Sequence, residues 1–275
     1  MSFLWYTAPA LLGAWFSHRF AWWRPTVPLH YPRVLMYHLV RNPIKGSRYN
    51  KLRVSPEDFD RQLGWLNKNG WQFQFASQLL NPPPGQLEKR VIITFDDGYE
   101  DNLTNALPLL EKHKAVATLF LVADRESCLD WPAQRKAARA QSDLSQERRL
   151  SDEQVRTLIK SGRFEIGSHT LTHPDLSTLD EAEKVRQLED SKRELEERFG
   201  VPIKTFCYPF GLYAAEDPER VKNAGYALAF TTEQGIATAQ TGRKLEWPRV
   251  KVSGTEGLYA FGLRMRTGFR GLKRR

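Results

Sequence analysis

The stretch VIITFDDG occupies residues 91–98 and is the most informative part of the chain. Five apolar or β-branched residues run directly into two carboxylates and a glycine, a pattern typical of a buried strand that ends in a turn. Strand-like runs also lie at residues 33–38, 115–122, 164–168, 204–208, 227–231 and 249–252. Helical patterns lie between many of these runs, at residues 102–113, 151–161, 180–199 and 218–224, and another helix begins at Ser55-Pro56.

Strands that alternate with helices predict a mostly parallel sheet, and about seven strands are enough to close it. We therefore expect an α/β fold: a distorted (β/α) barrel in a single domain. The composition agrees, because 41% hydrophobic and 27% charged residues are ordinary for a globular protein and exclude a disordered chain. In such a barrel the chemistry belongs at the C-terminal ends of the strands. Residues 124–150 fit neither pattern and are expected to form a helical excursion beside the site.

Two groups of polar side chains follow predicted strands. Asp96 and Asp97 end one strand, and His169 and His173 follow another within the run SHTLTH. One of two adjacent carboxylates can bind a metal while the other serves as a base, and two histidines four residues apart can converge on one ion. Taken singly, Asp-Asp-Gly is more often only a turn, and a His-x-x-x-His pair is more often not ligating. Together, at the ends of barrel strands, they predict a His/His/Asp metal site for hydrolysis.

Three motifs in order, TFDDG, SHTLTH and FCYPFG, resemble those of the NodB-homology polysaccharide deacetylases, carbohydrate esterase family four. The similarity runs from residue 33 to residue 252 and is strongest to the poly-N-acetylglucosamine deacetylase branch. The resemblance implies a distorted (β/α) barrel and the metal-assisted removal of acetyl groups from N-acetylated sugars.

The resemblance also implies roles for particular residues. Asp96 matches the catalytic base of the family, and three residues match its metal ligands, which usually hold zinc: Asp97, His169 and His173. We therefore expect one divalent metal ion, with zinc as the expected metal. The backbone N–H of Phe210 would complete an oxyanion hole, and Tyr208 would face the substrate beside it.

This chain departs from the family pattern in two places. The third motif usually carries an arginine where Cys207 stands, and Arg249 is the candidate replacement, with a plain packing role as the alternative. The usual histidine near the C-terminus is absent, because His173 is the last histidine of the chain. His38 ends the first predicted strand in a segment similar to one of the poly-N-acetylglucosamine deacetylase branch, where a histidine serves as acid. We expect His38 to protonate the departing amine, with a structural histidine as the alternative.

The net charge of +9 is unevenly distributed. Residues 1–56 contain eight basic residues, four of the eight tryptophans and no acid, and no acid follows Glu256. We expect three parts: an amphipathic membrane-associating segment at residues 1–30, the deacetylase domain at 31–260, and a basic tail at 261–275. The alternatives for the first segment are a helix that covers one end of the barrel, and a true span or uncleaved signal.

The expected partners follow from these features. They are an N-acetylated glycan or a lipid-linked amino sugar, such as a lipopolysaccharide intermediate, and an anionic membrane surface; no nucleic-acid motif is present. The acid-free, tryptophan-rich first stretch and the basic tail predict peripheral attachment to an inner membrane. The cytoplasmic face is favoured over the periplasmic face, because no convincing signal peptide is present and two cysteines make no disulfide framework. The sequence carries no signal for oligomeric state. Two other functions compete: a glycan-binding pseudoenzyme on the same barrel, and an amidohydrolase of the same fold that acts on small cyclic amides.

Overall fold

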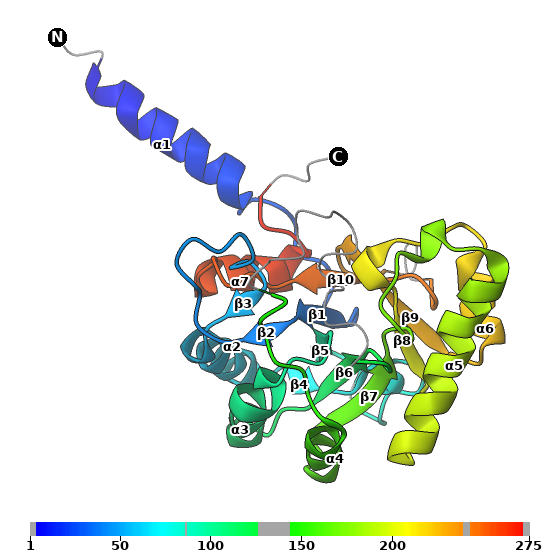
Figure 1. Cartoon of the computed structure of the whole chain (residues 1–275). Helices are drawn as coiled ribbons and strands as arrows, with labels where there is room; N and C mark the ends of the chain where they lie inside the picture. Colours follow the sequence, from blue (N-terminus) through cyan, green and yellow to red (C-terminus); the bar gives the residue numbers. More distant parts are fainter. Residues whose placement is uncertain (1–3, 86, 126–143, 239–242, 272–275) are drawn as a thin grey trace.

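A computed structural model describes residues 4–85, 87–125, 144–238 and 243–271, and its centre is a closed parallel barrel (Figure 1). Seven strands follow one another around it, in the order β1 (Arg33–Tyr37), β10 (Trp247–Lys251), β9 (Leu228–Gln234), β8 (Thr205–Cys207), β7 (Phe164–Ser168), β6 (Ala117–Leu121) and β5 (Arg90–Asp96). The pairing of β5 with β1 closes the ring. The predicted α/β barrel is therefore confirmed.

Three further strands of two residues each were not predicted. β4 (Gln72–Phe73) pairs with the start of β5, and β2 (Leu39–Val40) pairs with β3 (Arg53–Val54) in a small parallel sheet after β1. A strand of two residues has no alternation of polar and apolar side chains, so the sequence gives no pattern to detect.

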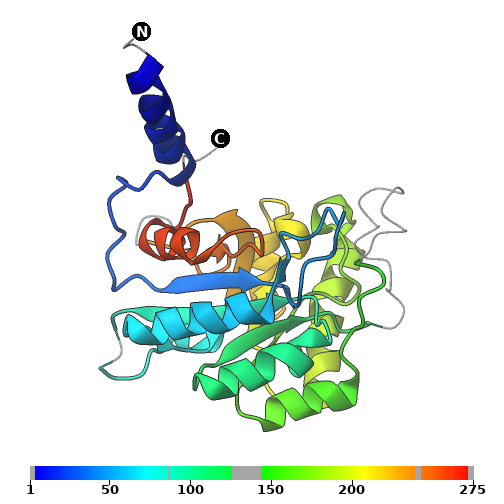
Figure 2. The same ribbon diagram turned by 90° about the vertical axis from the view of Figure 1, so that its left-hand side faces the viewer.

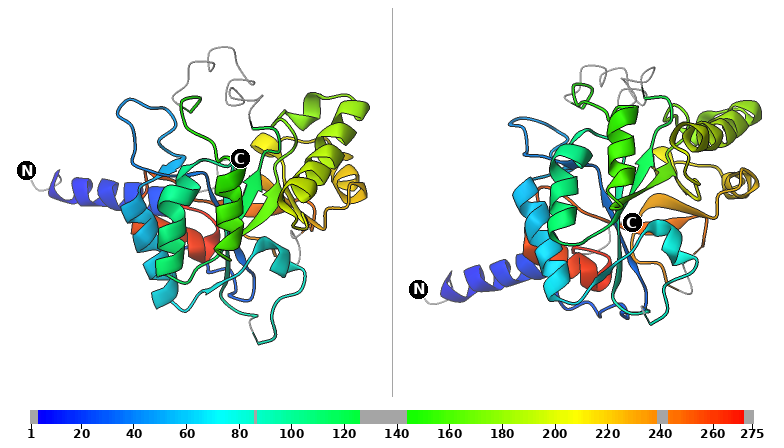
Figure 3. Two further views of the ribbon diagram at one scale, coloured as in Figure 1. Left: turned by 60° about the horizontal axis from the view of Figure 1, so that its bottom comes forward. Right: turned by 90° about the horizontal axis from the view of Figure 1, so that it is seen from below.

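Helices cover the outside of the barrel. They are α2 (Pro56–Lys68), α3 (Leu107–Lys112), α4 (Asp152–Lys160), α5 (Glu181–Phe199), α6 (Asp217–Asn223) and α7 (Leu258–Thr267). Figure 3 shows α2, α3 and α4 side by side along one flank. α2 begins where the sequence predicts, because the Ser55 side chain accepts a hydrogen bond from the Asp58 backbone N–H at 3.1 Å. Its buried residues then face the barrel: Phe59, Gln62, Leu63 and Leu66.

The predicted helix at residues 102–113 is divided in two. Its first part is a π-helix, η2 (Asn102–Ala106), and only the second part is the α-helix α3. π-helical turns are rare and often lie at functional sites. η2 follows the two carboxylates of the VIITFDDG stretch by only a few residues.

The last helix, α7, was not predicted, and the basic tail expected at 261–275 begins inside it. Phe261, Leu263 and Met265 are buried, so the first part of this tail belongs to the core. Arg33, at the start of β1 and fully buried, donates hydrogen bonds to the backbone carbonyls of Met265 at 2.9 Å and Val27 at 2.6 Å. One side chain thus ties β1, α7 and the segment before β1 together.

The first helix, α1 (Leu4–Phe20), projects away from the barrel (Figures 1 and 2). Leu11, Leu12 and Trp15 are 70%, 65% and 58% exposed. The alternative in which this segment covers one end of the barrel therefore does not hold. None of the helices in the described part of the chain has the length and hydropathy needed to cross a membrane.

Candidate active site

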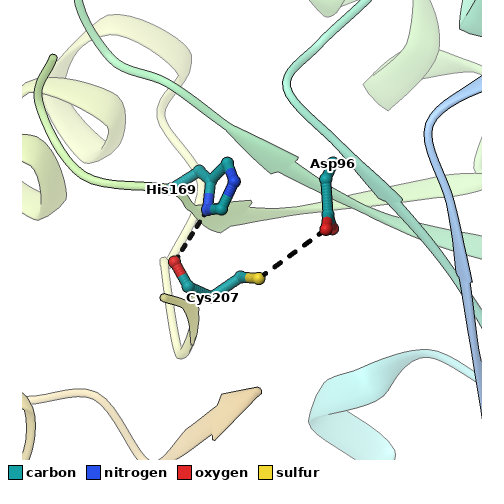
Figure 4. Close-up of side chains that lie close together, drawn as sticks. All are labelled: Asp96, His169 and Cys207. Carbon is teal, nitrogen blue, oxygen red and sulfur yellow. Dashed lines mark hydrogen bonds between the residues drawn. The ribbon is translucent and has the colours of Figure 1, made fainter. Parts of the chain in front are cut away.

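The carboxyl ends of neighbouring strands bring the predicted site residues together. Figure 4 shows the side chains of Asp96, His169 and Cys207, which come from the ends of β5, β7 and β8. All predicted site residues except Arg249 line one pocket of about 190 Å³: His38, Asp96, Asp97, His169, His173, Tyr208 and Phe210. Arg249 is fully buried and contacts Asp96.

Asp97 and the two histidines form a group that fits a divalent metal ion. The Asp97 Oδ1 atom lies 3.5 Å from His169 Nε2 and 3.4 Å from His173 Nε2, and the three ligand atoms all lie within 4.8 Å of one another. His169 Nδ1 lies 2.7 Å from the carbonyl oxygen of Cys207, which directs Nε2 toward Asp97. Burial would raise the pKa of Asp97, but hydrogen bonds from both histidines hold that pKa well below its usual value.

Hydrogen bonds with α5 and with the Thr170 side chain hold the loop that carries the two histidines. The side-chain oxygen of Gln187 accepts hydrogen bonds from the backbone N–H groups of Leu171 and Thr172, each at 3.0 Å. The Thr170 hydroxyl accepts a hydrogen bond from the His173 backbone N–H at 2.9 Å. The backbone between the two histidines is therefore held by hydrogen bonds within the fold.

Backbone strain is concentrated around this pocket. Of the seven non-glycine residues with positive φ angles in the described part of the chain, four lie in the three loops that form the site: Asp97 at 76°, Thr170 at 68°, His173 at 59° and Phe210 at 58°. Residues other than glycine rarely adopt a positive φ angle. Where they do, the surrounding structure enforces it, commonly at functional sites. Gly98 also has a positive φ angle of 75°, which glycine adopts without strain, and a Cβ atom there would in addition lie 2.5 Å from Leu121 Cδ1.

Asp96 has a different partner from its neighbour. Arg249 holds it through two hydrogen bonds, Nη1 to Oδ1 at 2.7 Å and Nη2 to Oδ2 at 2.8 Å. Burial would raise the pKa of Asp96, but the charge and hydrogen bonds of Arg249 hold that pKa below its usual value. The two adjacent carboxylates therefore have different charged partners. The guanidinium group of Arg249 contacts Asp96, and the imidazoles of His169 and His173 contact Asp97.

Arg249 reaches Asp96 from β10. The pairing of β10 with β9 shifts register between Trp247 and Arg249, and such irregularities re-aim side chains next to active sites. The guanidinium group also donates to the Thr231 carbonyl at 2.9 Å and to the Thr94 hydroxyl at 3.0 Å. Its Nη2 atom lies 3.1 Å from Cys207 Sγ, so the arginine occupies the space beside the short cysteine side chain.

His38 lines the pocket next to Asp96. Its Nε2 atom is 3.9 Å from Asp96 Oδ2, and its side chain is 16% exposed, so solvent and a bound molecule can reach it. Asn102 of η2 donates a side-chain hydrogen bond to the His38 carbonyl at 3.0 Å. The π-helix thus helps to position this histidine.

Phe210 and Tyr208 add aromatic rings to the lining of the pocket. The Phe210 ring meets His173 edge to face, with ring centroids 4.6 Å apart, and the Thr232 hydroxyl donates to the Phe210 carbonyl at 3.0 Å. The Tyr208 hydroxyl donates to the Leu245 carbonyl at 3.0 Å. The ring of Tyr208 therefore lines the pocket, while its hydroxyl group makes a structural hydrogen bond to the backbone.

Five pocket residues were missed from the sequence: Tyr49, Leu52, Tyr99, Leu144 and Thr232. Tyr99 directly follows TFDDG, so its place in the motif was a usable signal. The loop residues at 49 and 52 carry no such signal. Leu144 lies at the end of the expected excursion at 124–150, of which residues 126–143 lie outside the described part of the chain.

Comparison with known proteins shows the family. The sequence pattern described as polysaccharide deacetylase matches residues 84–229, more than half of the chain. The chain belongs to the polysaccharide deacetylase family. The resemblance predicted from three motifs is therefore confirmed.

Relatives of this polysaccharide deacetylase cover most of its length. YxkH of Bacillus subtilis is 31% identical over 245 residues, which cover 88% of this chain and 78% of YxkH. The poly-beta-1,6-N-acetyl-D-glucosamine N-deacetylase of Staphylococcus aureus is 25% identical over 239 residues, which cover 82% and 78% of the two chains. The solved structure of the Streptococcus pyogenes deacetylase PplD in complex with acetate is 25% identical with a TM-score of 0.71, covering 87% of this chain and 100% of PplD.

A second group of ligand atoms lies in the same polysaccharide deacetylase site. Asp96, His169 and Cys207 also place their ligand atoms within 4.8 Å of one another. However, the Arg249 guanidinium group contacts both the Asp96 carboxylate at 2.8 Å and the Cys207 sulfur at 3.1 Å. A buried positive charge disfavours a cation beside it. Asp97, His169 and His173 are therefore the better metal ligands.

Proposed function

We propose that this protein is a metal-dependent N-deacetylase that removes acetyl groups from an N-acetylated amino sugar. The observation that carries the proposal is that the two adjacent carboxylates have different partners. Asp97 faces two histidines, whereas Asp96 is held by Arg249 in the same pocket. This arrangement suits amide hydrolysis, which needs a metal ligand and a separate ionised base. The acetate bound to PplD and the name of the S. aureus relative support the same chemistry.

Asp97, His169 and His173 would hold the metal ion, which we propose to be zinc. Such an ion supplies Lewis-acid polarisation of the acetyl carbonyl and makes a bound water more acidic. Asp96 takes one proton from the attacking water, and Arg249 keeps its carboxylate ionised for that task. The backbone N–H of Phe210 donates to the developing oxyanion. His38 gives a proton to the sugar nitrogen as the carbon–nitrogen bond breaks, so the products are acetate and a free amine.

The substrate is proposed to be a glycan or a lipid-linked amino sugar, including a lipopolysaccharide intermediate. The pocket is lined by aromatic and apolar side chains from Tyr49, Leu52, Leu144 and Tyr208, which suit the apolar faces of sugar rings. The histidines and carboxylates of the same pocket are the residues to which we assign the cleavage of the acetyl group. This combination favours a sugar over a small cyclic amide.

The test is acetate release from N-acetylglucosamine oligomers and lipid-linked N-acetylated amino sugars, after chelation and again after adding zinc. Activity should depend on the metal. Asp96→Asn should keep the metal and lose about 10²–10⁴-fold in rate, because it removes only the proton acceptor. His169→Ala should lose both metal and activity.

Three results would contradict the proposal. Full metal content in His169→Ala would show that the ligands are assigned wrongly. Bound metal without acetate release from any glycan of the panel would favour the pseudoenzyme. Ring opening of cyclic amides without acetate release would favour the amidohydrolase.

A further inference from the structure

Exposed apolar side chains are concentrated in one segment of the described chain. Six of the ten large hydrophobic side chains that are exposed there lie between residues 11 and 23: Leu11, Leu12, Trp15, Phe16, Trp22 and Trp23. Isolated exposed apolar residues are ordinary on protein surfaces, whereas a contiguous group marks an interaction site. We call residues 11–24 the docking segment.

The docking segment is anchored to the barrel at its C-terminal end. Arg266 of α7 donates hydrogen bonds to the carbonyls of Trp22 at 3.0 Å and Arg24 at 2.7 Å. Phe20 meets Tyr259 of α7 edge to face, with ring centroids 5.3 Å apart, and Ala21 is only 1% exposed. The exposed side chains of α1 are therefore presented at a fixed place, away from the barrel (Figure 2).

The charge around these side chains is positive. Arg19 lies over the Trp15 ring, 5.8 Å from its centroid, and Arg24 lies over Phe269 at 5.3 Å. No acidic residue occurs within residues 1–56. On the adjoining α7 side, Glu256 is already paired with Arg264 at 2.8 Å and Arg270 at 2.9 Å. Tryptophan next to arginine is the combination that membrane–water interfaces favour.

The apolar surface continues onto the barrel. Tyr259, which contacts Phe20, also borders a pocket of about 420 Å³ between α2 and α7. Trp65 and Leu258 line the same pocket, and Lys89 and Arg266 add cations to its lining. The apolar surface beside the docking segment is therefore wider than one helix, and the charged residues that line this pocket are cations.

We propose that the docking segment attaches this protein to an anionic phospholipid membrane. The proposal goes beyond deacetylation and does not depend on it. The positive charge of the docking segment favours an anionic lipid as its partner over a second copy of the chain. If two docking segments paired, Arg19 and Arg24 of both copies would come close together, and the segment has no acidic residue to neutralise them. The cytoplasmic face of an inner membrane stays a prediction from the sequence.

The experiment is co-sedimentation of the full chain with phosphatidylcholine vesicles, with and without 30% phosphatidylglycerol. We expect binding to the anionic vesicles that weakens at high salt. Trp15→Ser/Trp22→Ser/Trp23→Ser should lose at least about tenfold in partition coefficient, and Arg19→Gln/Arg24→Gln about fivefold for each arginine. Leu87→Ser is the matched control, because Leu87 is 58% exposed outside the docking segment and should bind like the parent chain.

Three results would overturn the proposal. The first is a parent chain that stays in the supernatant with anionic vesicles at low salt. The second is a triple tryptophan variant that sediments with the vesicles as the parent chain does. The third is a parent chain that does not bind vesicles but self-associates with rising concentration in analytical ultracentrifugation, with the self-association lost in the triple variant. Thermal unfolding and acetate release from a soluble oligomer should not change in the triple variant. A failure of docking is thereby distinguished from a failure of catalysis.

Discussion

Arg249 is the residue on which the ionisation of Asp96, the proposed base, depends. It is fully buried, and its two terminal nitrogens contact both carboxylate oxygens of Asp96. Asp96 has a depressed pKa in the folded state, so this pair stabilises the fold above the unfolded pKa of Asp96. The stabilisation is lost as pH falls through the folded-state pKa. The same pair contributes to the acid stability of the fold and, with Asp96 as the proposed base, is expected to set the acid limit of activity.

Arg249→Lys should move the acid limb of the pH–rate profile to higher pH, because lysine keeps the charge but loses the two-pronged contact. Arg249→Met should destabilise the fold by about 3–5 kcal/mol, since it leaves a buried carboxylate without its partner. Rate profiles and urea unfolding measure these effects. Arg243→Lys, which changes an exposed arginine paired with Glu246, is the control. An unmoved acid limb in Arg249→Lys would assign Arg249 to packing alone.

His38→Gln should lower kcat for amide substrates while the metal content and the unfolding temperature stay unchanged. The histidine is proposed to protonate a poor leaving group, so an activated aryl acetate, whose leaving group needs no proton, should lose far less rate. His113→Gln is the matched control, because His113 pairs with Asp60 on the outside of the barrel. Equal losses on the amide and the ester would show that His38 acts on something other than the leaving group.

Sequence patterns located most of this site because its residues stand in short motifs. Asp96 and Asp97 end an apolar strand, and the barrel rule places them beside the two histidines that follow β7. The contact between Arg249 and Asp96 joins residues 153 positions apart, so only the family resemblance suggested it. Tyr49 could not be found at all, because the fold of its loop, not a motif, brings its ring to the pocket.

At the scale of elements, length decided what the sequence could predict. The seven barrel strands have apolar runs that stand out, whereas β2, β3 and β4 are too short to show a pattern. α7 was missed because Arg264 and Arg266 interrupt its apolar residues, so the segment resembles a basic tail. In the structure both arginines are engaged, one with Glu256 and one with backbone carbonyls. Tertiary contacts, not helical periodicity, explain this helix.

The junction between β2 and η2 should respond to pH through Asp101. The Asp101 carboxylate accepts hydrogen bonds from the Val40 backbone N–H and the Asn102 side chain, each at 3.1 Å. Burial raises the pKa of Asp101 to about 7. A raised pKa means that the folded state holds this proton more tightly than the unfolded state. The stabilisation is therefore present at low pH and lost as pH rises through about 7.

Asp101→Asn should remove this pH dependence, since asparagine keeps the oxygen that accepts from Val40 but cannot ionise. Relative to the parent chain, the variant should gain up to about 4 kcal/mol between pH 4 and pH 8, measured by urea unfolding. Asp180→Asn, which replaces one good N-cap residue of α5 by another, should show no such trend. A constant difference between parent and Asp101→Asn would mean that Asp101 is ionised throughout.

On the scale of the whole molecule, the catalytic and the proposed membrane-binding parts are structurally separate. Every barrel strand is paired on both sides through the closed ring, and α1 contributes no strand to it. Among the described residues, the docking segment meets the barrel through contacts of residues 16–24 with α7 and with the residues that follow α7, including the contacts of Phe16 and Phe20 with Tyr259. Changes to exposed side chains of α1 should therefore leave the pocket intact, which is why attachment and turnover can be measured apart.

The rate at which the buried thiol of Cys207 reacts with an alkylating agent can be used to measure local opening of the barrel. The side chain is fully buried at the end of β8, and burial raises the pKa of its thiol, so the native group is neutral and inaccessible. In a Cys128→Ser background, iodoacetamide should alkylate Cys207 at least about 10³-fold more slowly than it alkylates the urea-unfolded chain. Alkylation at the unfolded rate would mean that β8 separates from its neighbours freely. Otherwise the labelling rate in native buffer, followed by mass spectrometry, measures the free energy of opening at the strand that holds His169 in place.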